Sequence, residues 1–184
     1  IKSLPDFTHI LIPVKNVGEI IRLLDGLDGL ARFSVDQGQL EIAIDNMRIV
    51  SRTIDGNFPD YRAIIPKEYA TEAKVLKQDL LHTLKLSNLF SDSFNQISFS
   101  VSKDDKKIDV SSKNKDLGEH MSNVDASVTG EDIAVQFNFR YLNDCLSSVK
   151  GDSVQFSFAG KGRPIVVTGT SDKSFLYLMM PMNG

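Results

Sequence analysis

The sequence has little cysteine, little histidine and no long apolar run. Its 184 residues contain one cysteine, Cys145, and three scattered histidines, His9, His82 and His120. A single cysteine cannot form a disulfide within the chain, and none of these residues falls in a metal-ligand spacing. No apolar run approaches the roughly 20 residues that span a bilayer, and the start of the chain does not resemble a signal peptide. We therefore expect a protein of the reducing cytoplasm, without cofactor, metal or membrane contact.

The chain also lacks an excess of positive charge. Lysine and arginine total 21 against 24 aspartates and glutamates, which gives a formal net charge of -3. Contact with nucleic acid must therefore come from a local patch on an acidic protein. The length allows one complete domain plus part of another. Because the sequence begins without methionine, we expect a fragment of a longer protein.

Motifs for catalysis are missing as well. The sequence contains no nucleophile elbow, and its one candidate for a phosphate loop, Gly160-Lys161-Gly162-Arg163, lacks the preceding glycine spacing and the following serine or threonine. The segment Asp104-Asp105-Lys106-Lys107 is typical of a polar hairpin tip, and Cys145 of a small core residue. We expect no enzymatic activity.

An internal repeat organises what is present. Phe33-Ser34-Val35, Phe99-Ser100-Val101 and Phe156-Ser157-Phe158 are each followed by a polar turn and a second alternating run, a pattern that predicts a hairpin. A segment of helical period precedes each hairpin, a short apolar run precedes each helix, and a strand candidate follows each hairpin. The helices are expected at 15–27, 77–90 and 138–149, the first strands at 10–12, 73–76 and 133–137, and the last strands at 47–54, 118–129 and 175–182. The unit is therefore β-α-β-β-β, in three copies.

Three copies suggest one and a half domains. One amphipathic helix cannot cover a four-stranded sheet, so we expect two units to pair, with their helices side by side on a shared sheet. Residues 67–184 then form a complete α+β domain, and residues 1–66 hold half of another domain and a connector. The connector contains "GNFPDYRAIIP", Gly56 to Pro66. Its prolines fix their own φ and disfavour helix at the preceding residue, so we expect a stiff, extended strap.

Two motifs carry a resemblance to a known family. "DGNFPDYRAIIP" (55–66) and "YLMMPM" (177–182) are similar to segments of the bacterial DNA sliding clamp, the beta subunit of DNA polymerase III, and "FNFRYLNDCL" (137–146) resembles the family's corresponding helix start. The resemblance runs from about His9 to the end of the chain.

This resemblance implies a fold and an assembly. It implies the DNA-clamp fold, with three domains per subunit, each of two repeated units, and two subunits closing head to tail into a ring around duplex DNA. The helices would line the concave face and the antiparallel sheets the outside. Residues 1–66 would be the second half of the middle domain with its connector, and residues 67–184 the whole last domain. Such a chain cannot close a ring alone.

The resemblance also implies contacts with DNA and with a second subunit. Polar helix faces would meet the phosphates without reading sequence. The DNA-facing candidates are Lys15, Arg22, Gln78, His82, Lys85, Arg140, Asn143 and Lys150, with Ser147 on the same face. Because Glu19 and Asp144 share these faces, the alternative that they are merely solvated stays open. Lys85 and Leu86 are the implied subunit-interface residues, although Lys85 stands where the family usually has an apolar side chain.

The resemblance also implies a cleft for partner peptides. Family members bind short apolar peptides of DNA polymerase and clamp-loader subunits between the middle and last domains. The implied lining is Pro59, Ile64, Asn138, Tyr141, Pro164, Leu178, Met180, Pro181 and Met182. Flexible methionines beside prolines suit an adaptable groove. Two departures are Ala63, where many members have a basic residue, and the ending Asn183-Gly184, where a basic and apolar pair is common.

The sequence also fits two alternatives. "YLMMPM" also fits a core strand whose pairing ends at a proline. The chain also fits a peptide-binding adaptor module that does not encircle DNA, since an adaptor could work as this fragment and a clamp only as a ring.

Overall fold

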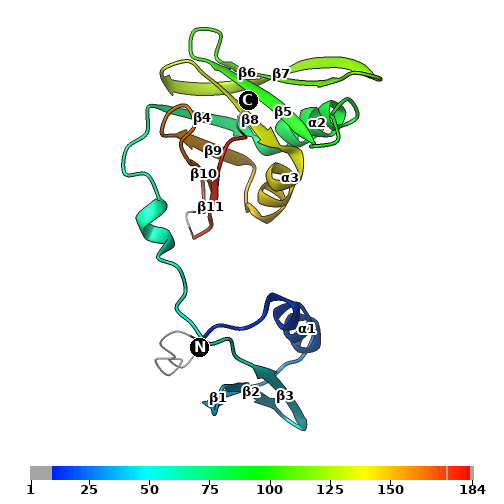
Figure 1. Ribbon diagram of the computed structural model, residues 1–184, viewed down its shortest axis with the longest axis vertical. Helices are drawn as coiled ribbons and strands as arrows, with labels where there is room; N and C mark the ends of the chain where they lie inside the picture. The colour runs from blue at the N-terminus through cyan, green and yellow to red at the C-terminus, as the bar shows by residue number, and fades with distance from the viewer. Residues whose placement is uncertain (1–9, 173, 183–184) are drawn as a thin grey trace. The chain divides into compact units, whose positions relative to one another are not determined.

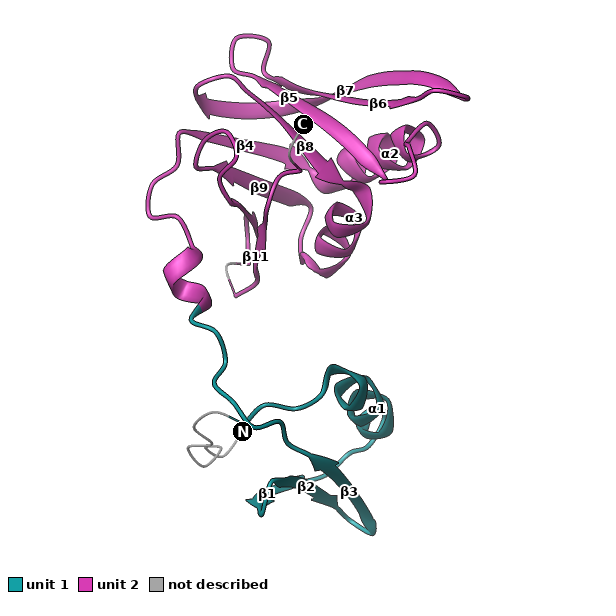
Figure 2. Cartoon of the chain, viewed as in Figure 1, with its two compact units in different colours: residues 1–60 teal, residues 61–184 magenta. Residues whose placement is uncertain are grey.

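The computed structural model describes residues 10–172 and 174–182. It divides into two compact units, Ile1–Asp60 and Tyr61–Gly184, which are coloured separately in Figure 2. No helix in the described part of the chain has the length and apolar character that a membrane crossing requires.

The first unit is one helix and a three-stranded meander. It contains α1 (Val14–Leu24), β1 (Arg32–Asp36), β2 (Gln39–Ile44) and β3 (Met47–Arg52), with the strands antiparallel in that order (Figure 1). The helix is shorter than predicted because Asp25 has extended backbone angles and Gly26 has a φ of 77°. The strand predicted at 10–12 was wrong, since only Leu11 is bridged, to Ile54, and the chain enters α1 directly after Pro13.

The first unit buries little apolar surface. Alternate residues of β2, Leu40, Ile42 and Ile44, are buried on one face of the sheet. The helix has no buried residue, and Val14 and Ile21 are 87% and 64% exposed. A helix of this amphipathic pattern normally covers its apolar stripe, so this unit alone is an incomplete core.

The second unit consists of two β-α-β-β-β repeats that share one sheet. A 3-10 helix, η1 (Tyr61–Ile64), precedes them. The first repeat is β4 (Thr71–Leu76), α2 (Lys77–Asn88), β5 (Gln96–Ser102), β6 (Lys107–Asn114) and β7 (Gly118–Gly130), and the second is β8 (Ile133–Asn138), α3 (Phe139–Ser148), β9 (Ser153–Phe158), β10 (Ile165–Gly169) and β11 (Leu176–Met179). The antiparallel strand order is β11-β10-β9-β4-β7-β6-β5-β8. The first strand of each repeat therefore pairs with the other repeat, β4 with β9 and β8 with β5.

The predicted hairpins are confirmed, and their registers are equivalent. The phenylalanine that begins each Phe-Ser motif pairs with the matching apolar residue of the next strand: Phe33 with Ile42, Phe99 with Val110, and Phe156 with Val167. The tip at residues 103–106 and the glycine-containing segment 160–163 lie between hairpin strands, as expected.

The core of the second unit lies between the shared sheet and its two helices. Phe99 contacts Phe137 and Phe156 edge to face, with ring centroids 5.2 and 6.0 Å apart. The helices contribute fully buried leucines, among them Leu84 and Leu146, and α2 and α3 lie next to each other (Figure 1). The two repeats thus complete one core, as the repeat pattern predicts.

Candidate functional site

An apolar groove lies between η1 and β11. It has a volume of about 610 Å³ and is lined by Tyr61, Arg62, Ile64, Ile65, Ser174, Leu176 and Leu178. Successive side chains of a strand point to opposite faces, and β11 follows this rule because Met179 is buried in the core while Leu176 and Leu178 face the groove. Ile64 is 57% exposed. We call this feature the η1–β11 groove.

Two of the predicted peptide-cleft residues, Ile64 and Leu178, line this groove. Met180 lies two residues beyond Leu178 and is 57% exposed, so it continues the apolar line without touching the groove. Pro181 and Met182 are half-buried and line a different hollow, on strands β5 to β8. The structure therefore brings part of the predicted set together.

The remaining predicted cleft residues have varied surroundings. Tyr141 is exposed on α3, and Pro164 is half-buried just before β10. Pro59 belongs to the first unit and is exposed. Asn138 is the N-cap of α3: its side chain accepts a hydrogen bond from the Arg140 backbone N–H at 2.9 Å and donates to a backbone carbonyl at 2.9 Å. This amide holds the start of the helix, and its role in binding stays a prediction.

Five residues that line the groove were not predicted from the sequence. Tyr61, Arg62 and Ile65 lie in the strap motif itself, where the guanidinium of Arg62 stands 5.9 Å from the centre of the Tyr61 ring. Leu176 could have been found by alternation from Leu178. Ser174 comes from a loop, whose placement no local pattern gives.

The predicted DNA-facing side chains of the second unit are largely exposed. Gln78, His82 and Lys85 lie four and three residues apart along α2, which places them on one stripe of the helix. On α3, Arg140 is exposed and Asn143 is half-buried, and Lys150 is exposed just beyond the helix. The helices are joined at this surface by Lys77, whose Nζ donates to the Val149 carbonyl at 2.8 Å.

The first unit has its own exposed cations. Lys15 and Arg22 are exposed on α1, seven residues apart. Arg22 forms an ion pair with Glu19 at 2.7 Å, which reduces the positive charge of this face. An exposed pair of this kind contributes little to stability.

The strand β7 has an open edge over its first half. Residues 118–125 pair with β6, whereas β4 pairs only with residues 126–130. The helix α2 packs beside β7, and three apolar side chains are exposed there: Leu86 by 38%, Leu89 by 65% and Met121 by 75%. An open strand edge beside apolar side chains can pair with another chain.

The single cysteine is buried in the core of the second unit. Burial raises the pKa of the Cys145 thiol to about 12, so the thiol stays protonated at neutral pH and is a poor nucleophile. Within residues 10–172 and 174–182, no group of three or more side chains is placed to hold a metal ion.

Family models match both units. The model of the DNA polymerase III beta subunit central domain matches residues 2–60, and that of the C-terminal domain matches residues 62–183. The chain belongs to the DNA polymerase III beta subunit family. The predicted family is therefore confirmed.

Individual relatives of this family agree. A beta sliding clamp of Haemophilus influenzae is 30% identical over 94% of the chain, and one of Bacillus subtilis is 26% identical over 95%. A crystal structure of the DNA polymerase sliding clamp from Pseudomonas aeruginosa with ligand has a TM-score of 0.89 at 22% identity, covering 95% of this chain and 48% of that chain. This likeness confirms the α+β clamp fold. The chain spans about half the length of the curated relatives, 47% in both cases.

Proposed function

We propose that this chain is part of a DNA sliding clamp, which encircles duplex DNA as a ring and tethers a replicative polymerase in the cytoplasm. Residues 1–66 are the second half of the middle domain with its connector, and residues 67–184 are the last domain. Family membership and relatives named beta sliding clamp support this proposal.

The observation that carries the proposal is the pairing of α2 and α3 on a shared sheet. Their exposed faces bear Gln78, Lys85 and Arg140, which suit phosphates and carry no base-reading pattern. Few cations with acidic neighbours give a weak, sequence-independent contact. A ring holds DNA by enclosure, so weak contact permits sliding.

The ring needs an interface with a second subunit. We assign it to the open edge of β7 together with Lys85 and Leu86, because both lie beside exposed apolar residues of α2. A head-to-tail contact of this kind joins two different surfaces. The first unit's uncovered apolar helix is consistent with a domain half that packs against residues outside this chain.

Enclosure predicts a dependence on DNA topology. The full-length protein, loaded onto nicked circular DNA and separated by gel filtration, is expected to stay with the circle and to be lost when the circle is linearised. The matched control is the same DNA cut before loading. Equal retention on circle and line would reject the ring and favour the peptide-binding adaptor, which the η1–β11 groove supports equally well.

Reversing cations on the helix face should weaken DNA contact. In the full-length protein, we expect Arg140→Glu with Lys150→Glu to weaken the salt dependence of binding. The slope of log affinity against log salt should become less negative by about 2, since each phosphate contact contributes about 0.9. Fluorescence anisotropy with a short labelled duplex measures this slope.

The control reverses the same two residue types elsewhere. Lys161 and Arg163 are exposed in the β9–β10 hairpin, so Lys161→Glu with Arg163→Glu should leave the slope unchanged. If both pairs reduce the slope equally, the assignment of DNA to the helix face is wrong.

We further assign the η1–β11 groove to short apolar peptides of DNA polymerase and clamp-loader subunits. Leucine and isoleucine side chains that face solvent around a concavity favour an apolar ligand. Tyr61 and Arg62 add a polar rim, and Met180, Pro181 and Met182 extend the surface beyond Leu178.

A further inference from the structure

A second groove lies on strands β5 to β8, on the face of the sheet opposite the helices. It consists of two adjoining hollows of about 750 and 430 Å³. Both are lined by the same four residues, Ser98, Ser111, Met121 and Gln136. We call the two hollows together the outer-sheet groove.

The shared residues form one row across the sheet. Ser98 of β5 pairs with Gln136 of β8 on one side and with Ser111 of β6 on the other, and Ser111 pairs with Met121 of β7. Directly paired residues point to the same face. The two serines are small, so the middle of the row is low, while Gln136 and Met121 rise at its sides. The groove therefore runs along the strands.

The length of the groove fits a short peptide. The next row on one side contains Ser100, Asp109 and Ala134, and the next row on the other contains Lys113 and Glu119. Same-face rows are two residues apart, about 6.6 Å, so three rows span about 13 Å. That is the length of about four residues of extended chain.

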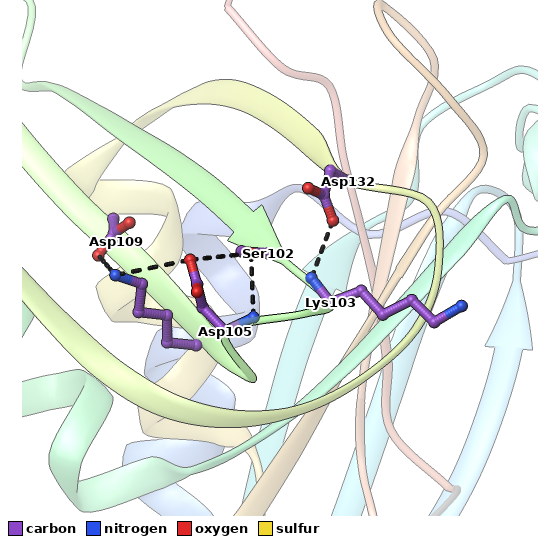
Figure 3. Close-up of polar contacts among 6 residues, drawn as sticks. Ser102, Lys103, Asp105, Asp109 and Asp132 are labelled. Carbon is purple, nitrogen blue, oxygen red and sulfur yellow. Dashed lines mark hydrogen bonds and ion pairs between the residues drawn. The ribbon is translucent and has the colours of Figure 1, made fainter.

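The carboxylates of the groove have partners within the protein, and Lys161, which also lines the larger hollow, is exposed. Asp109 pairs with Lys107 at 3.4 Å, and Glu119 with Lys113 at 3.6 Å. Asp92 accepts hydrogen bonds from two backbone N–H groups, of Phe94 and Gln96. At the β5–β6 hairpin, the Lys107 ammonium pairs with both Asp105 and Asp109, and the Lys103 N–H donates a hydrogen bond to Asp132 in the turn between β7 and β8 (Figure 3). A phosphate backbone would meet more carboxylates than lysines here.

One polar group of the groove is not satisfied. In the part of the chain that is described, the buried Oε1 of Gln136 has no hydrogen-bond partner. Gln136 lines both hollows of the groove. Since buried polar atoms are nearly always paired, this amide oxygen favours a ligand that donates a hydrogen bond to it.

The groove begins where the proposed peptide site ends. Pro181 and Met182 line its larger hollow, and the Met182 N–H donates to the Gln136 carbonyl at 2.8 Å, which fixes this wall. Met182 is four residues beyond Leu178 of the η1–β11 groove, so the chain between them spans at most about 14 Å.

Resting on the proposed peptide site, we propose that the outer-sheet groove binds a neutral polar extension of the same partner peptide. The apolar anchors occupy the η1–β11 groove. About four extended residues, rich in serine, threonine, glutamine or asparagine, cross Met182 and donate hydrogen bonds to Gln136 and the serines of the floor.

The test compares three peptides that share the same eight-residue apolar segment, called the core peptide. The probes are an eight-residue peptide with spaced leucine and phenylalanine, and the same peptide extended by Ser-Gln-Thr-Asn at its N-terminus or at its C-terminus. Titration of the 184-residue chain should give about five- to tenfold tighter binding for one extended peptide, the gain expected from a few net hydrogen bonds.

Variants separate the two grooves. Ser111→Arg fills the floor and Gln136→Leu removes the acceptor, so each should abolish the gain and leave the affinity of the core peptide within twofold. Thr129→Arg, exposed on the same strand β7 but outside the groove, should change neither. Leu178→Asp should weaken all three peptides.

The outcomes are distinguishable. If the core binds and neither extension helps, the outer-sheet inference is overturned and the peptide site survives. If the core does not bind, or binds equally to the Leu178→Asp protein, the proposed site fails and this inference with it. If Ser111→Arg alters only the association state in light scattering, the groove is a contact between copies, and the inference is again overturned.

Discussion

Leu178→Asp is expected to weaken the binding of an apolar partner peptide by at least about 100-fold. Leu178 faces the η1–β11 groove from the last strand, so the change removes an apolar contact worth about 1.5 to 3 kcal/mol. It also places a carboxylate against the ligand, where desolvation adds a further cost. Isothermal titration with the leucine- and phenylalanine-containing peptide measures the difference.

The control is Leu117→Asp, the same change at a side chain that is 62% exposed in the turn between β6 and β7. The Leu117→Asp change should leave the affinity for the peptide unchanged. If the apolar binding surface extends along the C-terminal segment, Met180→Asp should abolish peptide binding. A Leu178→Asp protein that binds within threefold of the original, while remaining folded by circular dichroism, would remove the groove from the binding site.

Sequence patterns predict the local part of this structure well. The hairpins at Phe33, Phe99 and Phe156 follow from alternation and a polar turn, both of which lie within about 15 residues. Exchange of first strands between the repeats, β4 onto β9 and β8 onto β5, was not predicted. Periodicity gives each strand its faces but does not name its neighbour. The failed strand at residues 10–12 has a similar cause, because an apolar run is a strand only where a partner lies alongside.

The site residues that lie in local sequence motifs were predicted, and those that meet only through the fold were not. Ile64 and Leu178 were found because each lies in a motif that resembles a known family. Leu176 shares a strand face with Leu178 and needed only alternation. The outer-sheet groove could not be found, because Gln136, Ser98 and Ser111 meet only through the register of three strands. A hollow made by small side chains leaves no signal along the sequence.

The equivalent phenylalanines of the repeat offer a test of how far the two units differ in packing. Phe99 is 1% exposed and contacts two other rings, whereas Phe33, at the same repeat position, is half-buried in a unit with few buried side chains. Phe99→Ala should therefore lower the free energy of unfolding of the second unit by about 3 to 5 kcal/mol. Phe33→Ala should lower the free energy of unfolding of the first unit by only about 1 kcal/mol, because the half-buried Phe33 side chain removes less apolar area from water on folding.

Hydrogen exchange followed by mass spectrometry reads the two units separately within one chain. Amides of β5 and β9 exchange through opening of the second unit's core, so Phe99→Ala should speed their exchange by about 100-fold or more, given 1.4 kcal/mol per tenfold. Amides of β2 should be unaffected by this change and should respond to Phe33→Ala. Phe99→Leu, which keeps most of the volume, should have a much smaller effect. Equal effects of the two alanine changes would mean that Phe33 is as well packed as Phe99, and that the first unit is a complete core by itself.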